Sequence, residues 1–238
     1  MKIILEIENL RKTFGGVVAV KNLSFYLKER EILGLMGPNG AGKTTVFNLI
    51  SGVYKPDSGT IKYMGMDITG LSPHQICRLG IARTYQIPRP FTGLTVFQNV
   101  LVAAVYGGDL ARALAEKKAL EVIDVVGLSG KKDVLAGSLK LAELRNLELA
   151  RALACRPKVL LVDEVAAGLT EAEIPQLLQT LKMINKMGVS ILLIDHVMRF
   201  MVDAVNRLIA IDSGEKIAEG EPKEVMAYEK VIESYLGR

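Results

Sequence analysis

The most constraining feature of the chain is a glycine-rich run, Gly37-Pro38-Asn39-Gly40-Ala41-Gly42-Lys43-Thr44, which fits the pattern G-x-x-x-x-G-K-[ST]. The hydrophobic stretch Glu31–Met36 precedes it and the helical pattern Thr44–Ser51 follows it, so a buried strand is expected to turn directly into a helix. Glycines allow the positive φ angles that let several backbone N–H groups point at one centre, and the start of the helix adds positive partial charge. The run therefore predicts a polyphosphate-binding loop.

Three side chains of this loop have distinct expected roles. The Lys43 ammonium would reach the β- and γ-phosphates of a nucleotide, and the Thr44 hydroxyl would be a ligand for Mg²⁺. Thr45 can donate a hydrogen bond to the α-phosphate. The alternative is a chance glycine-rich turn without a ligand, but chance does not also place the run between a strand and a helix.

Two acids end a second hydrophobic run. Asp163 and Glu164 follow Val159–Val162, and ligands of a parallel sheet gather at the carboxyl ends of its strands. We therefore expect Asp163 to hold Mg²⁺ through water beside the phosphate loop, and Glu164 to activate the attacking water as a general base. The alternative is a pair of capping residues at the start of the next helix.

A histidine follows a third hydrophobic run in the same way. His196 comes directly after Ile191–Asp195, so its imidazole could donate to the γ-phosphate and respond to its loss. His74 lies inside a helical pattern after Pro73 and is interpreted as structural.

Strand and helix signals together predict an α/β fold, with a mainly parallel central sheet covered by helices on both faces. Alternating patterns at Lys2–Leu10 and Leu23–Leu27 indicate a half-exposed, antiparallel β part near the N-terminus. Strand signals vanish from about Thr95 to Ala154, where three helical patterns follow one another. We expect a core at about residues 1–86 and 156–238, interrupted by a helical subdomain at about residues 87–155.

Composition and charge narrow the possible functions. Thirty basic and 26 acidic side chains leave a net charge of +4, and the basic residues are scattered rather than clustered, which argues against a nucleic-acid partner. No apolar stretch approaches the roughly 18–20 residues that span a bilayer, and no signal peptide is readable, so a cytoplasmic location is expected. Cys77 and Cys155 are too few and too separated in sequence for a zinc site or a disulfide framework.

In their order and spacing, these motifs resemble the ATPase subunit of ABC transporters, and the resemblance covers residues from about Leu5 to Leu236. It implies an ABC ATPase domain of the P-loop type spanning residues 1–238, with ATP and Mg²⁺ as ligands. Gln86 would then be the Q-loop glutamine, which contacts Mg²⁺ and the membrane partner, and Phe14 the aromatic residue that stacks on adenine. Ala167-Gly168-Leu169-Thr170 resembles the D-loop, and His196 the switch histidine.

Longer stretches are similar to the ATPases of branched-chain amino-acid importers. They are Phe14–Val20, Gly80–Gln86, Leu94–Val100, Lys216–Gly220 and Val231–Gly237. This resemblance implies a second, different ATPase subunit, two membrane permeases and an external solute-binding protein as partners. It also implies a peripheral position on the inner face of the cell membrane.

One segment departs from the family pattern L-S-G-G-Q, which completes the nucleotide site of the partner cassette. The corresponding residues here are Leu139-Lys140-Leu141-Ala142-Glu143. Lys140 replaces the serine that caps the helix, Ala142 replaces a glycine, and Glu143 brings a negative charge in place of glutamine. We expect the site completed by this segment to be the weaker of the two, unless the segment is a functional variant.

Two other function classes compete with a transport ATPase. The first is a soluble, non-transport ABC protein acting as a nucleotide-dependent switch on nucleic acid or the ribosome, but the chain has no room for the long arms or tandem cassettes typical of such proteins. The second is a nucleotide-binding but catalytically inactive partner, which the intact Glu164 and His196 argue against.

Overall fold

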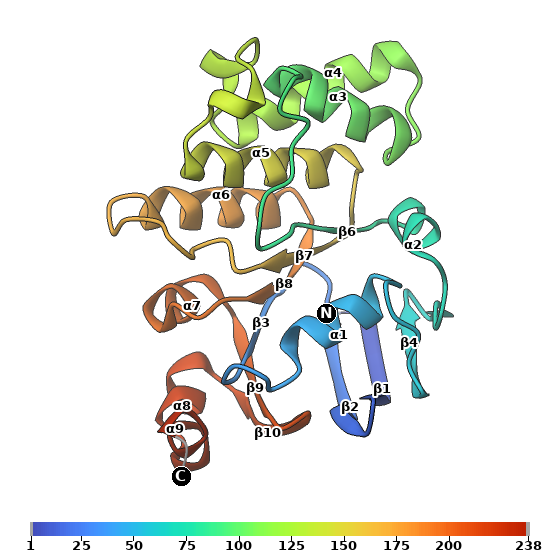
Figure 1. Cartoon of the computed structure of the whole chain (residues 1–238), viewed down its shortest axis with the longest axis vertical. Helices are drawn as coiled ribbons and strands as arrows, with labels where there is room; N and C mark the ends of the chain where they lie inside the picture. Colours follow the sequence, from blue (N-terminus) through green and yellow to red (C-terminus); the bar gives the residue numbers. More distant parts are fainter. Residues whose placement is uncertain (1, 237–238) are drawn as a thin grey trace.

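The computed structural model describes residues 2–236, and its centre is a six-stranded sheet in the order β10-β9-β3-β8-β7-β6 (Figure 1). Gly237, which ends one of the stretches quoted above, lies outside the described residues. The strands are β3 (Ile32–Met36), β6 (Ile81–Arg83), β7 (Val159–Asp163), β8 (Ser190–Ile194), β9 (Arg207–Asp212) and β10 (Glu215–Gly220). All neighbouring pairs are parallel except β9 and β10, which form the hairpin at Ser213-Gly214.

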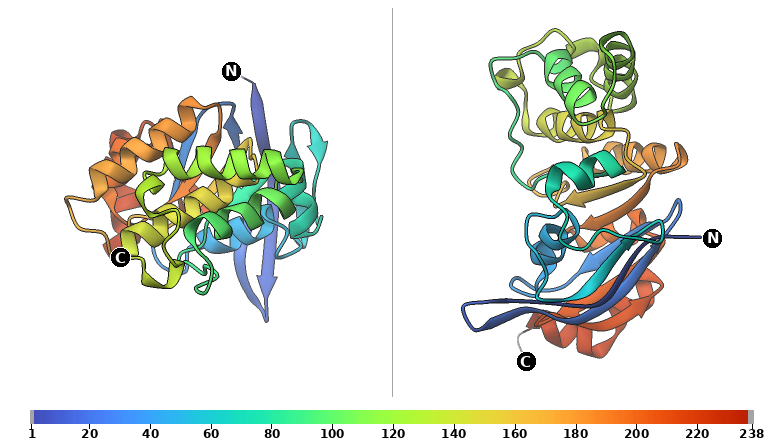
Figure 2. Two further views of the ribbon diagram at one scale, coloured as in Figure 1. Left: turned by 90° about the horizontal axis from the view of Figure 1, so that it is seen from above. Right: turned by 90° about the vertical axis from the view of Figure 1, so that its right-hand side faces the viewer.

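A second, antiparallel sheet is formed near the N-terminus, in the order β2-β1-β4-β5. Its strands are β1 (Ile3–Phe14), β2 (Val17–Lys28), β4 (Ser58–Tyr63) and β5 (Met66–Asp67). Figure 2 shows the β1–β2 hairpin extending beyond the rest of the molecule.

The helices follow the expected patterns with small shifts at their ends. They are α1 (Lys43–Ile50), α2 (Pro73–Leu79), α3 (Val96–Tyr106), α4 (Arg112–Val125), α5 (Leu141–Ala154), α6 (Ile174–Lys186), α7 (Met198–Ala204), α8 (Pro222–Ala227) and α9 (Glu229–Leu236). Helix α6 begins at Ile174, after a turn in which the Thr170 N–H and hydroxyl both bond the Glu173 carboxylate at 2.8 Å.

The hydrophobic core is divided by the central sheet, because successive side chains of a strand point to opposite faces. Leu161 of β7 packs with α1 and the antiparallel sheet on one face. Leu160 and Val162 pack with the helices α3 to α7 on the other face. Strands β3, β7 and β8 are buried along their whole length, which explains why they are hydrophobic runs rather than alternating ones.

Helices α3, α4 and α5 pack against one another on one side of the sheet, at the top of Figure 1. The division of the chain into a core and a helical subdomain at residues 87 and 155 stays a prediction. No helix between residues 2 and 236 is both long and apolar enough to cross a membrane.

The order of the central strands positions the site. Strand β8 lies between β3 and β7, and both pairings are parallel, so the carboxyl ends of the three strands meet at one edge of the sheet. The phosphate-loop motif follows β3, the two acids end β7, and His196 follows β8. The expected convergence of these motifs is confirmed.

Candidate functional site

The phosphate-loop motif connects β3 to α1 and depends on glycine at specific positions. Gly42 has a φ of 102°, and a Cβ atom there would lie 2.2 Å from the carbonyl oxygen of Ala19 on β2. A Cβ atom at Gly37 would lie 2.1 Å from the carbonyl oxygen of Ile211 on β9. Close packing against two neighbouring strands therefore leaves room only for glycine, which explains the first and last glycines of the motif.

The Lys43 ammonium lies inside the loop. Its Nζ donates to the carbonyl oxygens of Gly37 at 2.6 Å and Pro38 at 2.9 Å, and the residue is buried. Burial lowers the pKa of Lys43, while the charges of Glu164 and Asp163 act in the opposite direction. The ammonium is thus a buried cation between the loop carbonyls and the two acids at the end of β7.

Asp163 is buried at the end of β7 and forms an ion pair with Arg83 of β6. The Arg83 Nη2 donates to Asp163 Oδ2 at 2.8 Å. Burial raises the pKa of Asp163, and the hydrogen bond from Arg83 opposes this shift. Arg83 belongs to a stretch that the sequence analysis quoted without assigning a role to this residue.

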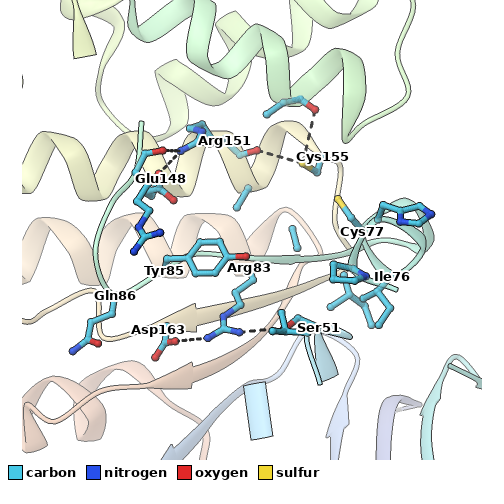
Figure 3. A pocket seen from close by; sticks show the side chains of 18 of the residues that line it. Ser51, Ile76, Cys77, Arg83, Tyr85, Gln86, Glu148, Arg151, Cys155 and Asp163 are labelled. Carbon is cyan, nitrogen blue, oxygen red and sulfur yellow. Dashed lines mark hydrogen bonds and ion pairs between the residues drawn. The ribbon is translucent and has the colours of Figure 1, made fainter. Parts of the chain in front are cut away.

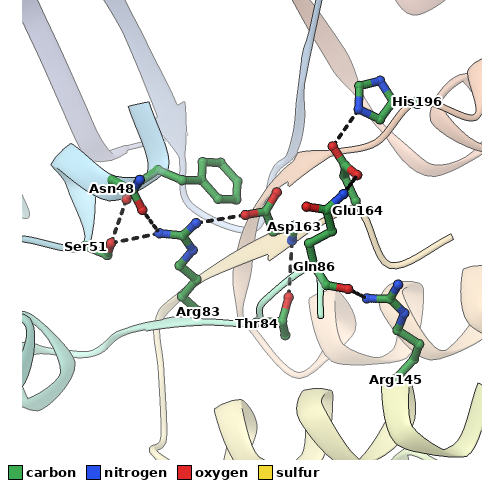
Figure 4. A network of polar contacts seen from close by, with 10 residues as sticks. Asn48, Ser51, Arg83, Thr84, Gln86, Arg145, Asp163, Glu164 and His196 are labelled. Carbon is green, nitrogen blue, oxygen red and sulfur yellow. Dashed lines mark hydrogen bonds and ion pairs between the residues drawn. The ribbon is translucent and has the colours of Figure 1, made fainter. Parts of the chain in front are cut away.

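Glu164 is the centre of a polar network with bonds to both of its carboxylate oxygens (Figure 4). His196 Nε2 lies 2.5 Å from Glu164 Oε1, and the Gln86 amide donates to Glu164 Oε2. The structure therefore brings together three residues that were predicted separately, from β7, from the segment after β6, and from the segment after β8.

The backbone around His196 is fixed by Asp195, which the sequence analysis did not consider. The Asp195 carboxylate accepts from the N–H groups of Ala166 at 2.9 Å, His196 at 2.8 Å and Val197 at 3.0 Å. Burial raises the pKa of Asp195, and these hydrogen bonds lower it. Asp195 thus ties the turn after β7 to the turn after β8 and holds both at a constant separation.

Arg145 of α5 is a second buried cation that the sequence analysis missed. It donates to the carbonyl oxygen of Gln86 through Nη1, and to that of Ala167 at 3.4 Å through Nη2. The helix that carries the signature-like segment is therefore bonded to the backbone of both the Gln86 segment and the turn after β7. An arginine inside an amphipathic helical pattern gave no sequence signal for these contacts.

A cavity of about 1050 Å³ lies between the end of β7, α2 and α5 (Figure 3). Thr44, Gln86 and Asp163, the three predicted magnesium ligands, are among its lining residues. Phe14 packs edge-on against Tyr54, another lining residue, with ring centroids 5.1 Å apart. Phe14, the residue predicted to stack on adenine, therefore contacts a residue that lines the cavity.

The signature-like segment lies at a different place. Lys140 is the N-cap of α5, and it borders a second cavity of about 490 Å³ with Ala142 and Glu143. None of these three residues is among those lining the larger cavity with Thr44 and Asp163.

The Glu143 carboxylate, which is expected to bring a negative charge to the partner's nucleotide, is bonded within this chain. Lys131 Nζ forms an ion pair with Glu143 Oε1, and the Lys140 N–H donates to Glu143 Oε2 at 3.0 Å. These bonds, first that of Lys131, lower the pKa of Glu143. No periodic pattern links Lys131 to this segment, because irregular chain separates Lys131 from the start of α5.

The two cysteines, widely separated in sequence, are neighbours in the fold. Both line the larger cavity, Cys77 from α2 and Cys155 from the end of α5 (Figure 3). The neighbouring Cys155 thiol lowers the pKa of Cys77 to about 7, and the same pairing raises the pKa of Cys155. The Cys155 Sγ also donates to the carbonyl oxygens of Arg151 at 3.5 Å and Ala103 at 3.8 Å. Both are free thiols, and no group of three or more His, Cys, Asp or Glu residues in the described part of the chain could hold a metal ion.

Comparison with known proteins places these features in a family. A family model described as "ABC transporter" matches residues 20–167. The chain is 37% identical to the high-affinity branched-chain amino acid transport ATP-binding protein LivG of Salmonella typhimurium, with 98% of each chain covered. It is 36% identical to the lipopolysaccharide export system ATP-binding protein LptB of Haemophilus influenzae, with 98% of this chain and 97% of the relative covered.

Solved structures give the same result for the fold. The chain matches the ADP conformation of MJ1267, an ATP-binding cassette of an ABC transporter, with a TM-score of 0.92 and 29% identity over the full length of both chains. The predicted fold class, an α/β cassette with an antiparallel N-terminal part, is confirmed.

Proposed function

The chain belongs to the ABC transporter family, and from this premise we propose that it is the ATP-hydrolysing subunit of an importer for branched-chain amino acids or related polar solutes. The observation that carries the proposal is the convergence of the phosphate loop, Asp163-Glu164 and His196 at one edge of the sheet. Likeness to LivG over nearly the whole chain supports the solute class.

The chemistry of the cavity residues fits Mg²⁺ bound with ATP. Thr44 offers a hydroxyl, Asp163 a carboxylate and Gln86 an amide oxygen, and hard cations prefer such oxygen donors. Bound Mg²⁺ would supply neutralisation of the charge on the phosphate oxygens. Lys43 adds a cation on the loop side, and the glycine-lined backbone of Gly37–Gly42 supplies the N–H donors.

Hydrolysis would depend on Glu164 as the general base for the attacking water. In the structure, both Glu164 oxygens already accept bonds, from His196 and from Gln86. Each carboxylate oxygen has two lone pairs, so Glu164 can still accept a bond from the attacking water beside these two partners. The backbone carbonyl oxygen of Gln86 accepts a hydrogen bond from Arg145 of α5. A movement of α5 would therefore be transmitted to Gln86.

The proposed role as the ATPase subunit of an importer implies several partners. A second ATPase subunit would supply the signature segment that completes this chain's site, and membrane permease subunits would contact the region of Gln86 and the helices α3 to α5. An external solute-binding protein would deliver the solute, and the chain would lie on the inner face of the membrane without contacting nucleic acid. Recovery with permeases in fractionation supports this assignment, whereas recovery on ribosomes or DNA contradicts it in favour of a non-transport switch.

A single substitution tests the catalytic assignment. We expect Glu164→Gln to lower the ATPase rate by about 10²- to 10⁴-fold, because it removes the general base. Binding of a fluorescent ATP analogue with Mg²⁺ should be retained, since the phosphate loop is unchanged.

Glu116→Gln, on the exposed side of α4, is the matched control and should leave the rate unchanged. A Glu164→Gln variant with wild-type turnover would contradict the role of Glu164. A wild-type chain that binds no nucleotide in the same titration would overturn the proposed function itself.

A further inference from the structure

The Arg83 side chain is largely covered at the edge of the central sheet and joins two parts of the nucleotide site. Its side chain is 7% exposed, and that of Asp163 is 5% exposed. Besides the bond to Asp163, its Nη1 donates to Asn48 Oδ1 at 2.6 Å and to Ser51 Oγ at 3.2 Å. One guanidinium therefore connects the end of β7 to the last turn of α1, the helix that begins at the phosphate loop (Figure 4).

Two aromatic rings lie close to this guanidinium. The Arg83 Cζ lies 5.5 Å from the ring centroid of Phe47 on α1 and 5.1 Å from that of Tyr85. Phe47 is fully buried, whereas Tyr85 is 51% exposed and lines the larger cavity (Figure 3). These two rings and the hydrogen bonds to three side chains restrict the rotation of the guanidinium.

The carboxylate of Asp163 is thereby held on one side only. Arg83 occupies Oδ2, while no protein donor among residues 2–236 bonds Oδ1. Arg83 and Tyr85 line the same cavity as Thr44 and Asp163. The Arg83 guanidinium therefore lies directly beside the predicted magnesium ligands. This arrangement leaves one oxygen of a rigidly oriented carboxylate for a further partner.

We propose that Arg83 is a positioning residue, which fixes the orientation in which the Asp163 carboxylate reaches the water shell of the nucleotide's Mg²⁺. The inference rests on the proposed function, because it takes Asp163 as a metal-holding residue.

Two effects of Arg83 on the metal oppose each other. Its positive charge repels Mg²⁺, whereas its hydrogen bond removes the rotational freedom of the carboxylate. Loss of a residue that orients a metal ligand commonly lowers metal affinity by about 10- to 100-fold. The contact between Asp163 and Mg²⁺ is expected to run through water, so the lower end of this range applies.

The test compares the Mg²⁺ dependence of nucleotide binding in four variants of the full chain. A fluorescent ATP analogue is titrated in EDTA and then at increasing Mg²⁺. The Mg²⁺ midpoint is the Mg²⁺ concentration at which the Mg²⁺-dependent change in nucleotide binding is half complete. Arg83→Gln should raise this midpoint by about tenfold, whereas the affinity for the nucleotide in EDTA should be unchanged. Arg83→Lys, which keeps the charge without the fork, should give a smaller rise, and so should Tyr85→Ala, which removes one ring.

Arg207→Gln is the matched control, because Arg207 is also a partly buried arginine of the central sheet that bonds a carboxylate and stacks on a tyrosine. It should leave the Mg²⁺ midpoint unchanged, even if thermal unfolding shows a lower stability. If Arg83→Gln does not fold, Arg83→Lys and Tyr85→Ala carry the test.

The outcomes separate the two proposals. An unchanged or lowered Mg²⁺ midpoint in the Arg83 variants, with a wild type that binds MgATP, overturns this inference alone. An equal shift in Arg207→Gln overturns it too, because the effect is then one of general stability. A wild type that binds no nucleotide overturns the proposed function and this inference with it.

Discussion

Glu164 has a backbone conformation that ordinary residues rarely adopt. Its φ is 47°, in the left-handed region, where a non-glycine residue costs on the order of 1–3 kcal/mol. Its N–H donates to the carbonyl oxygen of Ile194 at 2.8 Å, and its two oxygens bond His196 and Gln86. The strained residue is therefore held by contacts from three directions, and this fixes where the carboxylate points as the chain leaves β7.

At the same scale, the cysteine pair gives a prediction about pH. The Cys77 pKa of about 7, compared with 9.0 for an ordinary cysteine, means that its thiolate forms at lower pH. Because the thiolate is the reactive species, alkylation of Cys77 by iodoacetamide should reach half its maximal rate near pH 7. Mass spectrometry of the labelled peptides at pH 5 to 9, a range of about two units on either side, measures this rate.

The control is Cys155→Ser, which removes the thiol that stabilises the Cys77 thiolate and should move the midpoint upward. Cys155, whose pKa is raised, should label slowly throughout. A midpoint near 9 for Cys77 in the unmodified chain would show that the two thiols do not interact in solution.

At the scale of single elements, the starts of α3 and α5 form a contrasting pair. Thr95 caps α3 in both directions: its hydroxyl accepts from the Gln98 N–H at 3.1 Å, and its own N–H donates to Gln98 Oε1 at 2.9 Å. At α5, Glu143 accepts from the Lys140 N–H, but a lysine side chain has no acceptor with which to return the bond. Half of the capping box is therefore missing at the signature-like segment.

We expect Lys140→Ser to complete this box and raise the free energy of unfolding by about 0.5–2 kcal/mol. Lys140 already has the extended backbone that an N-cap needs, with φ −73° and ψ 165°. The substitution also removes a cation from the positive end of the helix. Urea denaturation measures the change.

Thr95→Ala is the matched substitution of opposite sign, and should lower the free energy of unfolding by a similar amount. A Lys140→Ser variant no more stable than the wild type would mean that α5 gains nothing from a capping hydroxyl.

At the scale of the whole molecule, the two cavities divide the chain into two working surfaces. The larger cavity is lined by Thr44, Gln86 and Asp163, among others. The smaller cavity is lined by Lys140, Ala142 and Glu143, among others. Helix α5 connects them, because Arg145 bonds the Gln86 backbone while the start of the same helix forms the smaller cavity. We propose that a change at either surface is transmitted along this helix.

The altered signature-like segment predicts unequal sites in an assembled transporter with two different ATPases. The site built on this chain's phosphate loop would be completed by the partner's signature, and the other by Lys140–Glu143. Glu164→Gln should therefore lower the ATPase rate of the assembly more than the same change of the corresponding acid in the partner. Equal losses, measured on the two singly substituted assemblies, would show that the altered segment supports hydrolysis.

The sequence by itself determined the local parts of this protein. The glycines of Gly37–Gly42, the lysine after them and the acids after a hydrophobic run act within a few residues of chain, so their pattern predicts their structure. The convergence of the three motifs needed only the rule that parallel strands present their carboxyl ends at one edge. These residues remain predictions as functional groups, although the structure places them together.

Only the tertiary structure decided which distant side chains meet. Arg83 bonds Asp163 because β6 is the neighbour of β7 at the edge of the sheet, and Cys77 meets Cys155 because α2 packs beside the end of α5. Lys131 neutralises Glu143 across a turn that carries no periodic pattern. Periodicity and spacing report the environment of a residue along its own element, whereas these contacts depend on how all the elements pack, and that is a property of the whole chain.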